Sequence, residues 1–307
     1  MAMNTLTHAC RTLELNGSDY PELLRQSSDP PQRLYVKGDP EALRQPMIAL
    51  VGSRHASDYG RLVCERLAGE LAARGITVVS GLAVGIDAAA HRGALAVEGR
   101  TVAVLGHGLN FIYPRENAGL ARRILDTGGA IVTEFEPGEG VQPFNFPKRN
   151  RIISGLSLGV VVVEAAKKSG SLITARLAME DGREVFAVPG PVTSERSEGV
   201  HRLIQDGAKL VHNVDDILEE IPQLSDLRLP ERKVSPEAPA LVDQEAHLYS
   251  MLGDEPRHVD ELIQASTLPA QDVIQGLMTL TLKKLAQELP GRRFVRSVRT
   301  AVTRDGY

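Results

Sequence analysis

Short apolar runs recur along the chain from residue 47 onward, and most are rich in Val and Ile. They occupy residues 47–52, 76–81, 101–106, 130–135, 159–165, 184–190 and 208–211. The stretches between them place apolar residues at helical spacing. Strands that are apolar on both faces and alternate with amphipathic helices are typical of a mostly parallel sheet covered on both sides. The pattern therefore predicts a doubly wound α/β domain, with ligands bound at the carboxyl ends of its strands.

The remaining segments predict a lead-in, a linker and a small second domain. Residues 12–46 are rich in Pro and polar groups, with one strand-like run at 33–36, and we expect the lead-in, 1–46, to pack on the main domain, 47–221. Residues 222–240 carry four prolines and no apolar periodicity, which indicates a linker. Residues 241–307 contain three helical stretches and a hairpin-like pair at 288–296. This element order predicts a winged-helix type module.

Composition narrows the class of protein further. The 307 residues carry a formal net charge of −4, with 42% hydrophobic and 24% charged residues, which excludes wholesale disorder. Cys10 and Cys64 form neither a disulfide framework nor a metal-ligand spacing. The N-terminus lacks a secretory signal pattern, and no apolar run is long enough to span a bilayer. We expect a cytoplasmic protein with no membrane association.

The first two strand ends offer groups that suit an anion. Ser53 and Arg54 follow the first strand, and the free N–H groups of a helix starting near Ser57 would attract phosphate. A plain turn with a solvated Arg54 is the alternative. Gly81 and Gly85 follow the second strand and permit close approach of a ligand, although no dinucleotide fingerprint is present. Asp87 would cap the next helix or contact a ligand, and His91 is expected to be a packing residue.

Later strand ends add cations, aromatic rings and hydroxyl groups. Arg115 lies near a predicted helix start, and the stretch 142–157 combines aromatic rings with positive charge. Cations grip phosphates and exposed rings stack on bases, which is the pattern of single-strand binding. The alternative is a core Phe beside a solvated basic helix start. The candidate residues of these later strand ends are Arg115, Phe144, Phe146, Lys148, Arg149, Asn150, Arg151, Lys167, Lys168, Ser169, Gly170, Ser171 and Thr174.

The turn at 167–174 resembles an anion cradle but lacks the Walker spacing, so triphosphate hydrolysis is not indicated. No paired carboxylates, Cys–His pair or metal cluster accompanies the cations. Cations without a base or nucleophile favour holding a polyanion over cutting it. The sequence therefore predicts a binding protein that is not an enzyme and needs no cofactor or metal.

The sequence resembles the DprA/Smf family of bacterial DNA-processing proteins. The resemblance is carried by Val51–Arg54, Ser80–Asp87 with Ala90-His91, Tyr113–Asn117, Phe146–Leu156, Ser169–Thr174 and Val188–Gly190, and also by Tyr20–Leu24 and Leu34–Gly38. It implies an extended Rossmann domain that binds single-stranded DNA without sequence preference, forms a homodimer, and recruits and loads RecA in natural transformation. By motif, Arg54, Arg115 and the 148–151 run correspond to the family's DNA pocket.

The sequence departs from the family pattern at three places. Val84 stands where the family often has Arg, which removes a cation near the pocket mouth. Only about twenty residues precede the first match, so the usual helical N-terminal extension is missing, and the segment 281–285 departs from the family's wing. Two other functions stay open. One is a Rossmann-type nucleotide monophosphate phosphoribohydrolase, which the missing acid/base pair disfavours. The other is a transcription factor, which a helix at 269–282 without Lys or Arg disfavours.

Overall fold

The computed structural model describes residues 10–227, 243–253, 255–283 and 285–296. The chain divides into two compact units, Met1–Leu229 and Pro230–Tyr307. The first unit is an α/β domain with a mostly parallel central sheet, as the apolar pattern predicts.

Within the described residues, the sheet of the first unit has nine strands in the order β1-β2-β6-β5-β4-β3-β7-β8-β9. Strand β2 runs antiparallel to β1 and to β6, and every other neighbouring pair is parallel. The strands are β1 (Cys10–Glu14), β2 (Arg33–Gly38), β3 (Met47–Val51), β4 (Thr77–Ser80), β5 (Thr101–Val104), β6 (Ala130–Thr133), β7 (Gly159–Val162), β8 (Glu184–Ala187) and β9 (Lys209–Leu210).

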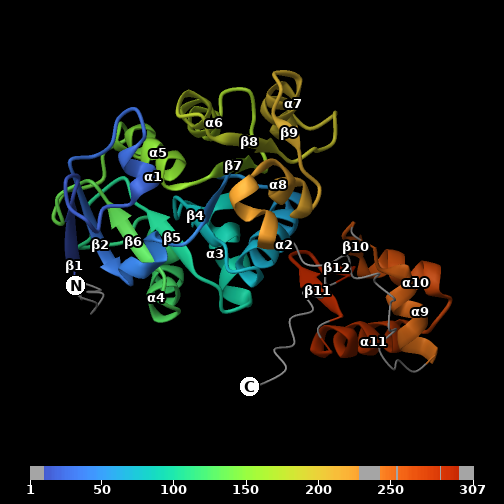
Figure 1. Ribbon diagram of the computed structural model, residues 1–307. Helices are drawn as coiled ribbons and strands as arrows, with labels where there is room; N and C mark the ends of the chain where they lie inside the picture. Colours follow the sequence, from blue (N-terminus) through green and yellow to red (C-terminus); the bar gives the residue numbers. More distant parts are fainter. Residues whose placement is uncertain (1–9, 228–242, 254, 284, 297–307) are drawn as a thin grey trace. The chain divides into compact units, whose positions relative to one another are not determined.

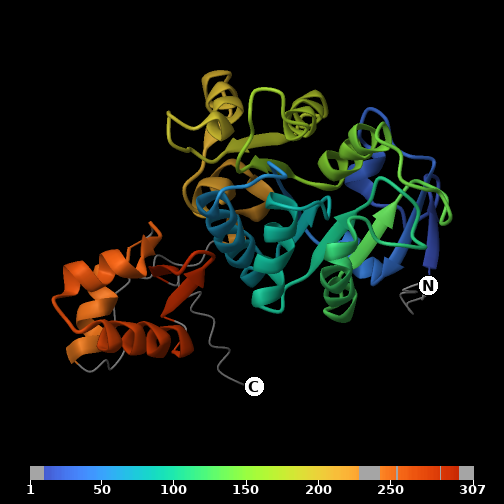
Figure 2. The same ribbon diagram turned by 180° about the vertical axis from the view of Figure 1, so that it is seen from behind.

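Helices cover both faces of this sheet (Figures 1 and 2). Alternate residues of each central strand point to opposite cores, because side chains alternate across a strand. On β3, for example, Ala49 joins one core and Leu50 the other. One face packs against α1 (Glu22–Arg25), α5 (Asn145–Leu156), α6 (Ser171–Glu180) and α7 (Glu198–Gln205), and the other against α2 (Asp58–Ala73), α3 (Ile86–Ala96), α4 (Ala118–Asp126) and α8 (Asp215–Glu220).

The strand order reverses beside β3. The chain moves outward from β3 through β4 and β5 to β6, then returns to place β7 on the other side of β3. Such a reversal leaves a crevice outside the carboxyl ends of the strands, where ligands of open α/β sheets bind. The topology therefore predicts a ligand site formed by the loops after β3, β4 and β7.

The second unit has the winged-helix architecture expected from its element order. Its apolar core includes Leu248, Leu262, Leu277 and Phe294. The three strands of its sheet lie in the order β10-β12-β11 among the described residues. The elements are α9 (Asp243–Met251), β10 (Arg257–His258), α10 (Val259–Ser266), α11 (Ala270–Leu282), β11 (Ala286–Leu289) and β12 (Arg293–Arg296).

Two boundaries differ from the sequence interpretation. The described part of the predicted lead-in, residues 10–46, adds β1 and β2 to the sheet of the first unit. The linker predicted at 222–240 starts too early, because Pro222–Leu227 forms the 3-10 helix η4 and buries Leu224 completely in the first unit. Residues 228–242 of that linker lie outside the described residues.

Candidate nucleic-acid interface

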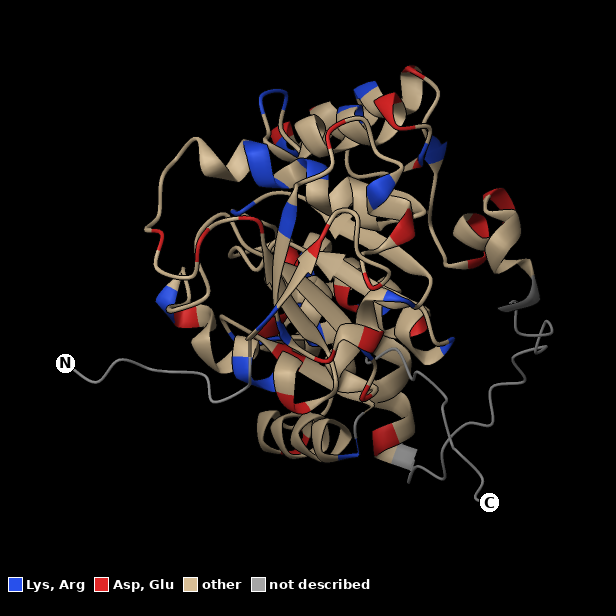
Figure 3. Ribbon diagram, turned by 60° about the vertical axis from the view of Figure 1, so that its left-hand side comes forward, with Lys and Arg blue, Asp and Glu red and all other residues tan. Residues whose placement is uncertain are grey.

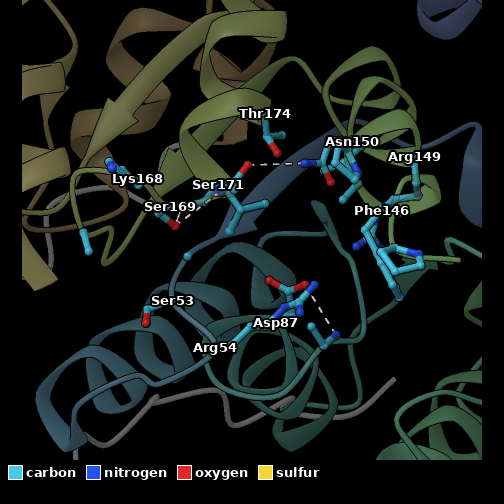
Figure 4. Close-up of a pocket in the computed structure, with 18 of the residues that line it drawn as sticks. Ser53, Arg54, Asp87, Phe146, Arg149, Asn150, Lys168, Ser169, Ser171 and Thr174 are labelled. Atoms are coloured by element: carbon cyan, nitrogen blue, oxygen red, sulfur yellow. Dashed lines mark hydrogen bonds between the residues drawn. The ribbon is translucent and has the colours of Figure 1, made fainter.

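A pocket of about 710 Å³ opens at the strand-order reversal (Figure 4). The loop after β3 and the loop after β4 form one side, and helix α5 with the start of α6 forms the other. Predicted site residues that line it are Ser53, Arg54, Phe146, Arg149, Asn150, Lys168, Ser169, Gly170, Ser171 and Thr174. Segments about 120 residues apart in sequence thus meet at one rim, as expected for carboxyl ends of neighbouring parallel strands.

A cation and an aromatic ring lie in contact at the mouth of this pocket. The Arg54 guanidinium lies 5.3 Å from the centre of the Phe146 ring. Tyr113 adds a second ring, 6.1 Å from Phe146, and 48% of its surface is exposed. Arg54 is itself exposed, and no carboxylate among residues 10–227 is recorded as its ion-pair partner. This corner offers a positive charge and stacking surface together, and both are open to solvent.

The opposite wall of the pocket carries hydroxyl groups at the start of α6. The Ser169 and Ser171 hydroxyls lie 2.8 Å apart, and Thr174 follows one turn later with 1% exposure. Asn150 of α5 donates from Nδ2 to the Gly170 carbonyl at 3.3 Å, which ties the two helices together. Since a helix start favours negative charge, this wall and the exposed Lys168 suit a phosphate.

Arg149 lies in the floor of the pocket and is almost fully buried. Its Nη1 donates to the carbonyl of Gly81 at 2.8 Å and also to that of Val104, at the ends of β4 and β5. Burial lowers the pKa of Arg149 to about 10, although the Asp87 carboxylate opposes that shift. Burial also raises the pKa of Asp87, against the stabilising charge of Arg149. Arg149 joins the ends of β4 and β5 from within, so it has a structural task.

The start of α2 is not available to an external anion. Ser57 caps the helix by accepting from the Gly60 N–H at 3.0 Å. The carboxylate of Glu164, which is 5% exposed, accepts from the Ser57 N–H at 2.9 Å and from its hydroxyl. A Cβ on Gly60 would lie 2.4 Å from that carboxyl carbon, so the space is filled. The expectation of a phosphate site at this helix start is therefore wrong, because the Glu164 carboxylate already occupies that position.

Two cations of the predicted 148–151 cluster face another pocket. Lys148 and Arg151 line a cavity of about 540 Å³ on the other side of α5 from Phe146 and Asn150. Both are ion-paired with Glu134, at 3.1 Å and 2.8 Å. Figure 3 shows basic and acidic residues interspersed over the first unit. The cluster thus does not present all of its charge to one ligand.

The other predicted residues have separate places. Arg115 and Lys167 are exposed and do not line the first pocket, and the Phe144 side chain is 71% exposed at the start of α5. Gly81 packs against Arg149, where a Cβ would lie 2.4 Å from Nη1. Gly85 has a φ of +81°, and a Cβ there would lie 2.2 Å from the Ser53 carbonyl oxygen. Both glycines permit close packing within the protein itself.

The structure also places His91, Asp87 and Tyr113. His91 is a buried packing histidine as expected, with Nδ1 2.7 Å from the Thr101 hydroxyl. Asp87 is not the cap of α3, since Gly85 takes that position. Tyr113 was not singled out as a contact. Its signal was an aromatic residue directly before a Pro-Arg pair at a strand end.

Comparison with known proteins identifies the family. Residues 11–222 match DNA recombination-mediator protein A, and residues 232–292 match the DprA winged helix domain. The chain belongs to the DNA recombination-mediator protein A family. This member is 46% identical over 280 residues to Protein Smf of Escherichia coli (strain K12), covering 89% of this chain and 74% of that protein.

Solved structures of two DNA processing proteins A are similar in fold to most of this chain. The protein from Streptococcus pneumoniae is 42% identical, with a TM-score of 0.64, and the match covers 71% of this chain and 76% of that one. The protein from Helicobacter pylori, whose structure gave insight into its single-stranded DNA binding mode, is 32% identical. Its TM-score is 0.63, and the match covers 71% of this chain and 97% of that one.

Among the described residues, no group of three or more His, Cys, Asp or Glu side chains is arranged to hold a metal ion. No helix in the described part of the chain is long and apolar enough to cross a membrane.

Proposed function

We propose that this protein binds single-stranded DNA without sequence preference in the pocket at the strand-order reversal. The observation that carries the proposal is the Arg54–Phe146 corner, where an exposed guanidinium lies 5.3 Å from a ring and faces a wall of hydroxyl groups. The cation suits a phosphate, and the rings suit unpaired bases of any identity, because every base has a stacking face. The single-stranded DNA binding mode of the Helicobacter pylori relative supports the same interpretation.

A hydrolase is a poorer fit to the pocket. The only carboxylate among its described lining residues is Asp87, which lies beside the buried Arg149 guanidinium. The lining includes no His or Cys that would act with it as a second acid or base. Nucleotide hydrolysis needs a positioned group that exchanges a proton with the substrate. We therefore propose a binding protein and not a phosphoribohydrolase.

The wider role follows from the family. We propose that the protein acts in the cytoplasm as a homodimer that recruits RecA and loads it on the bound strand during natural transformation and recombination. The recombination-mediator family assignment supports this role. Sedimentation of the purified protein tests the dimer. RecA filament formation on strands with and without the protein tests the loading step.

The proposal is tested by titrating a fluorescent oligo-dT strand and a duplex of equal length with wild-type and R54A protein. Wild type should prefer the single strand, and R54A should bind it at least about tenfold more weakly, since a charge-assisted contact is lost. Arg202→Ala is the matched control. It removes the same charge from an exposed residue of α7 that pairs with Asp206 and does not line the pocket. Equal affinities of R54A and wild type would refute the proposed site.

A further inference from the structure

The second pocket, beside helix α5, is lined by charges of both signs. Its described lining contains four acidic residues and three basic ones, so it does not present a surplus of positive charge to DNA. These residues are Glu14, Asp29, Glu134, Glu136, Arg33, Lys148 and Arg151. The cavity measures about 540 Å³. Its charge balance differs from that of the first pocket, whose described lining carries Arg54, Lys168 and Arg149 with one acid.

Glu134 is the centre of this network. It follows β6 directly, and only 9% of its side chain is exposed. A single oxygen, Oε2, lies 3.1 Å from Lys148 Nζ and 2.8 Å from Arg151 Nη2. The other oxygen, Oε1, is buried and has no recorded hydrogen-bond partner within the described part of the chain. One buried carboxylate thus neutralises two cations of α5.

The two cations differ in how firmly they are held. The Arg151 side chain is 12% exposed and also donates to Asp29 at 2.7 Å, so it is fixed between two carboxylates. The Lys148 side chain is 53% exposed, and its ammonium also lies 5.4 Å from the Phe135 ring. Water screens the charge of a half-exposed ammonium, so its ion pair contributes less free energy than one in which both partners are buried. Lys148 is therefore the cation that an incoming phosphate can compete for.

The Glu134–Lys148 pair lies along the same edge of the sheet as the first pocket. The first pocket is at the carboxyl ends of β3, β4 and β7, and Glu134 continues from the carboxyl end of β6, two strands beyond β4 on the same edge. Neighbouring strands are about 4.8 Å apart, so the two positions are separated by roughly 10 Å. A strand of DNA that leaves the first pocket along this edge passes α5 and reaches Lys148.

We propose that Glu134 limits the affinity for single-stranded DNA by holding Lys148 in an ion pair. The inference rests on the proposed function and adds a residue that opposes binding. Phosphate and Glu134 compete for the same ammonium, whereas Arg151 stays with Asp29 and Glu134. Removing the charge of Glu134 releases one cation beside the path of the strand and adds one phosphate contact.

The experiment measures the affinity of full-length protein for oligo-dT strands of increasing length by fluorescence anisotropy, over a series of salt concentrations. E134Q should bind a long strand about two- to fivefold more tightly than wild type, the range expected for one half-exposed ion pair. Its plot of log affinity against log salt should be steeper by about 0.7, the increment for one more phosphate contact on a single strand. Strands too short to leave the first pocket should show no gain.

Glu136→Gln is the matched control. Glu136 lines the same pocket and carries the same charge, but its recorded ion pair is with Arg33, at 3.6 Å. The proposal predicts no gain for E136Q, and an equal gain would overturn it by showing a general charge effect. The double variant E134Q/K148Q should lose the gain of E134Q. A gain that persists without Lys148, or an E134Q affinity equal to or below that of wild type, also overturns the proposal.

Melting curves of each variant separate binding from folding. If E134Q fails to fold, K148Q alone still decides, because it leaves the contacts of Arg151 with Asp29 and Glu134 in place. Its affinity should fall less than about twofold, and a loss of tenfold or more would overturn the proposal. The wild-type and R54A titrations test the proposed function separately. If wild type does not bind single strands or R54A changes nothing, the function fails, whatever E134Q does.

Discussion

Replacing Arg149 with leucine should destabilise the first unit by about 3–5 kcal/mol, because it removes a buried guanidinium that donates to two backbone carbonyls and lies near the Asp87 carboxylate. Arg149 was predicted from the sequence to bind DNA, but 4% of it is exposed and its guanidinium donates to two backbone carbonyls. The variant distinguishes these two tasks. A residue that only contacts DNA can be removed with little effect on stability.

The expected magnitude follows from the contacts. Each hydrogen bond from a charged group to the carbonyl of Gly81 or Val104 contributes about 1.5–3 kcal/mol. The variant also leaves the Asp87 carboxylate, which is 8% exposed, without its positive neighbour. Leucine recovers part of this loss by filling the space with apolar atoms. The expected net cost is therefore about 3–5 kcal/mol.

Urea unfolding followed by circular dichroism at pH 7 measures the effect. The double variant D87N/R149L should be at least about 1 kcal/mol more stable than R149L, because a neutral amide is buried at lower cost than an unpaired carboxylate. Arg202→Leu, at an exposed site, should change the stability by no more than about 0.5 kcal/mol. A cost below about 1 kcal/mol for R149L, or no recovery in the double variant, would refute the structural role of Arg149.

Three further predictions concern stability. Burial lowers the pKa of His91 to about 3, so between pH 6.5 and pH 3 only the unfolded state binds a proton at this histidine. The free energy of unfolding should therefore fall by up to about 1.4 kcal/mol per pH unit as the pH decreases toward 3. H91Q should lack this part of the slope in acid unfolding curves. Gly85→Ala should lower the free energy of unfolding, measured in urea, by about 2 kcal/mol or more, and should weaken the binding of single-stranded DNA by displacing Ser53. Gly182→Ala is the control, since Gly182 also has a positive φ but has open space around it, and it should cost about 1 kcal/mol. Glu164→Gln should lower the free energy of unfolding by about 1–2 kcal/mol, because the start of α2 loses its internal anion; an unchanged urea midpoint would contradict this.

The parallel core could be predicted from the sequence because its strands are buried on both faces. Strands β3 to β7 are buried at every position and mostly apolar, and a run of that kind needs no alternation to be recognised. Strand β1 was missed for the opposite reason. Its sequence CRTLE buries Leu13 alone, and it becomes a strand only by pairing with β2 along the sheet edge.

The site could be predicted only in part. The rule that parallel strands end at one edge was enough to bring Arg54 and Lys168 to the same pocket. The sequence could not show which residues of the 148–151 run face DNA. Adjacent residues of a helix point in different directions, and only tertiary packing decides which groups each side chain contacts. Asp29 and Glu134, which neutralise Arg151, lie 122 and 17 residues away, so no local pattern connects them to it.

The distribution of free charge also predicts how binding depends on salt. The sequence supplies seven candidate cations at the strand ends, but one is buried on carbonyls and two are paired with Glu134. Within the described residues, this leaves four exposed cations without a recorded ion pair, namely Arg54, Arg115, Lys167 and Lys168. Each phosphate contact on a single strand contributes about −0.7 to the slope of log affinity against log salt, so the slope should be about −3 and not about −5. A measured slope near −4 would mean that DNA displaces Glu134 from both cations, and the balance of charge in the second pocket would then be a feature of the free protein alone.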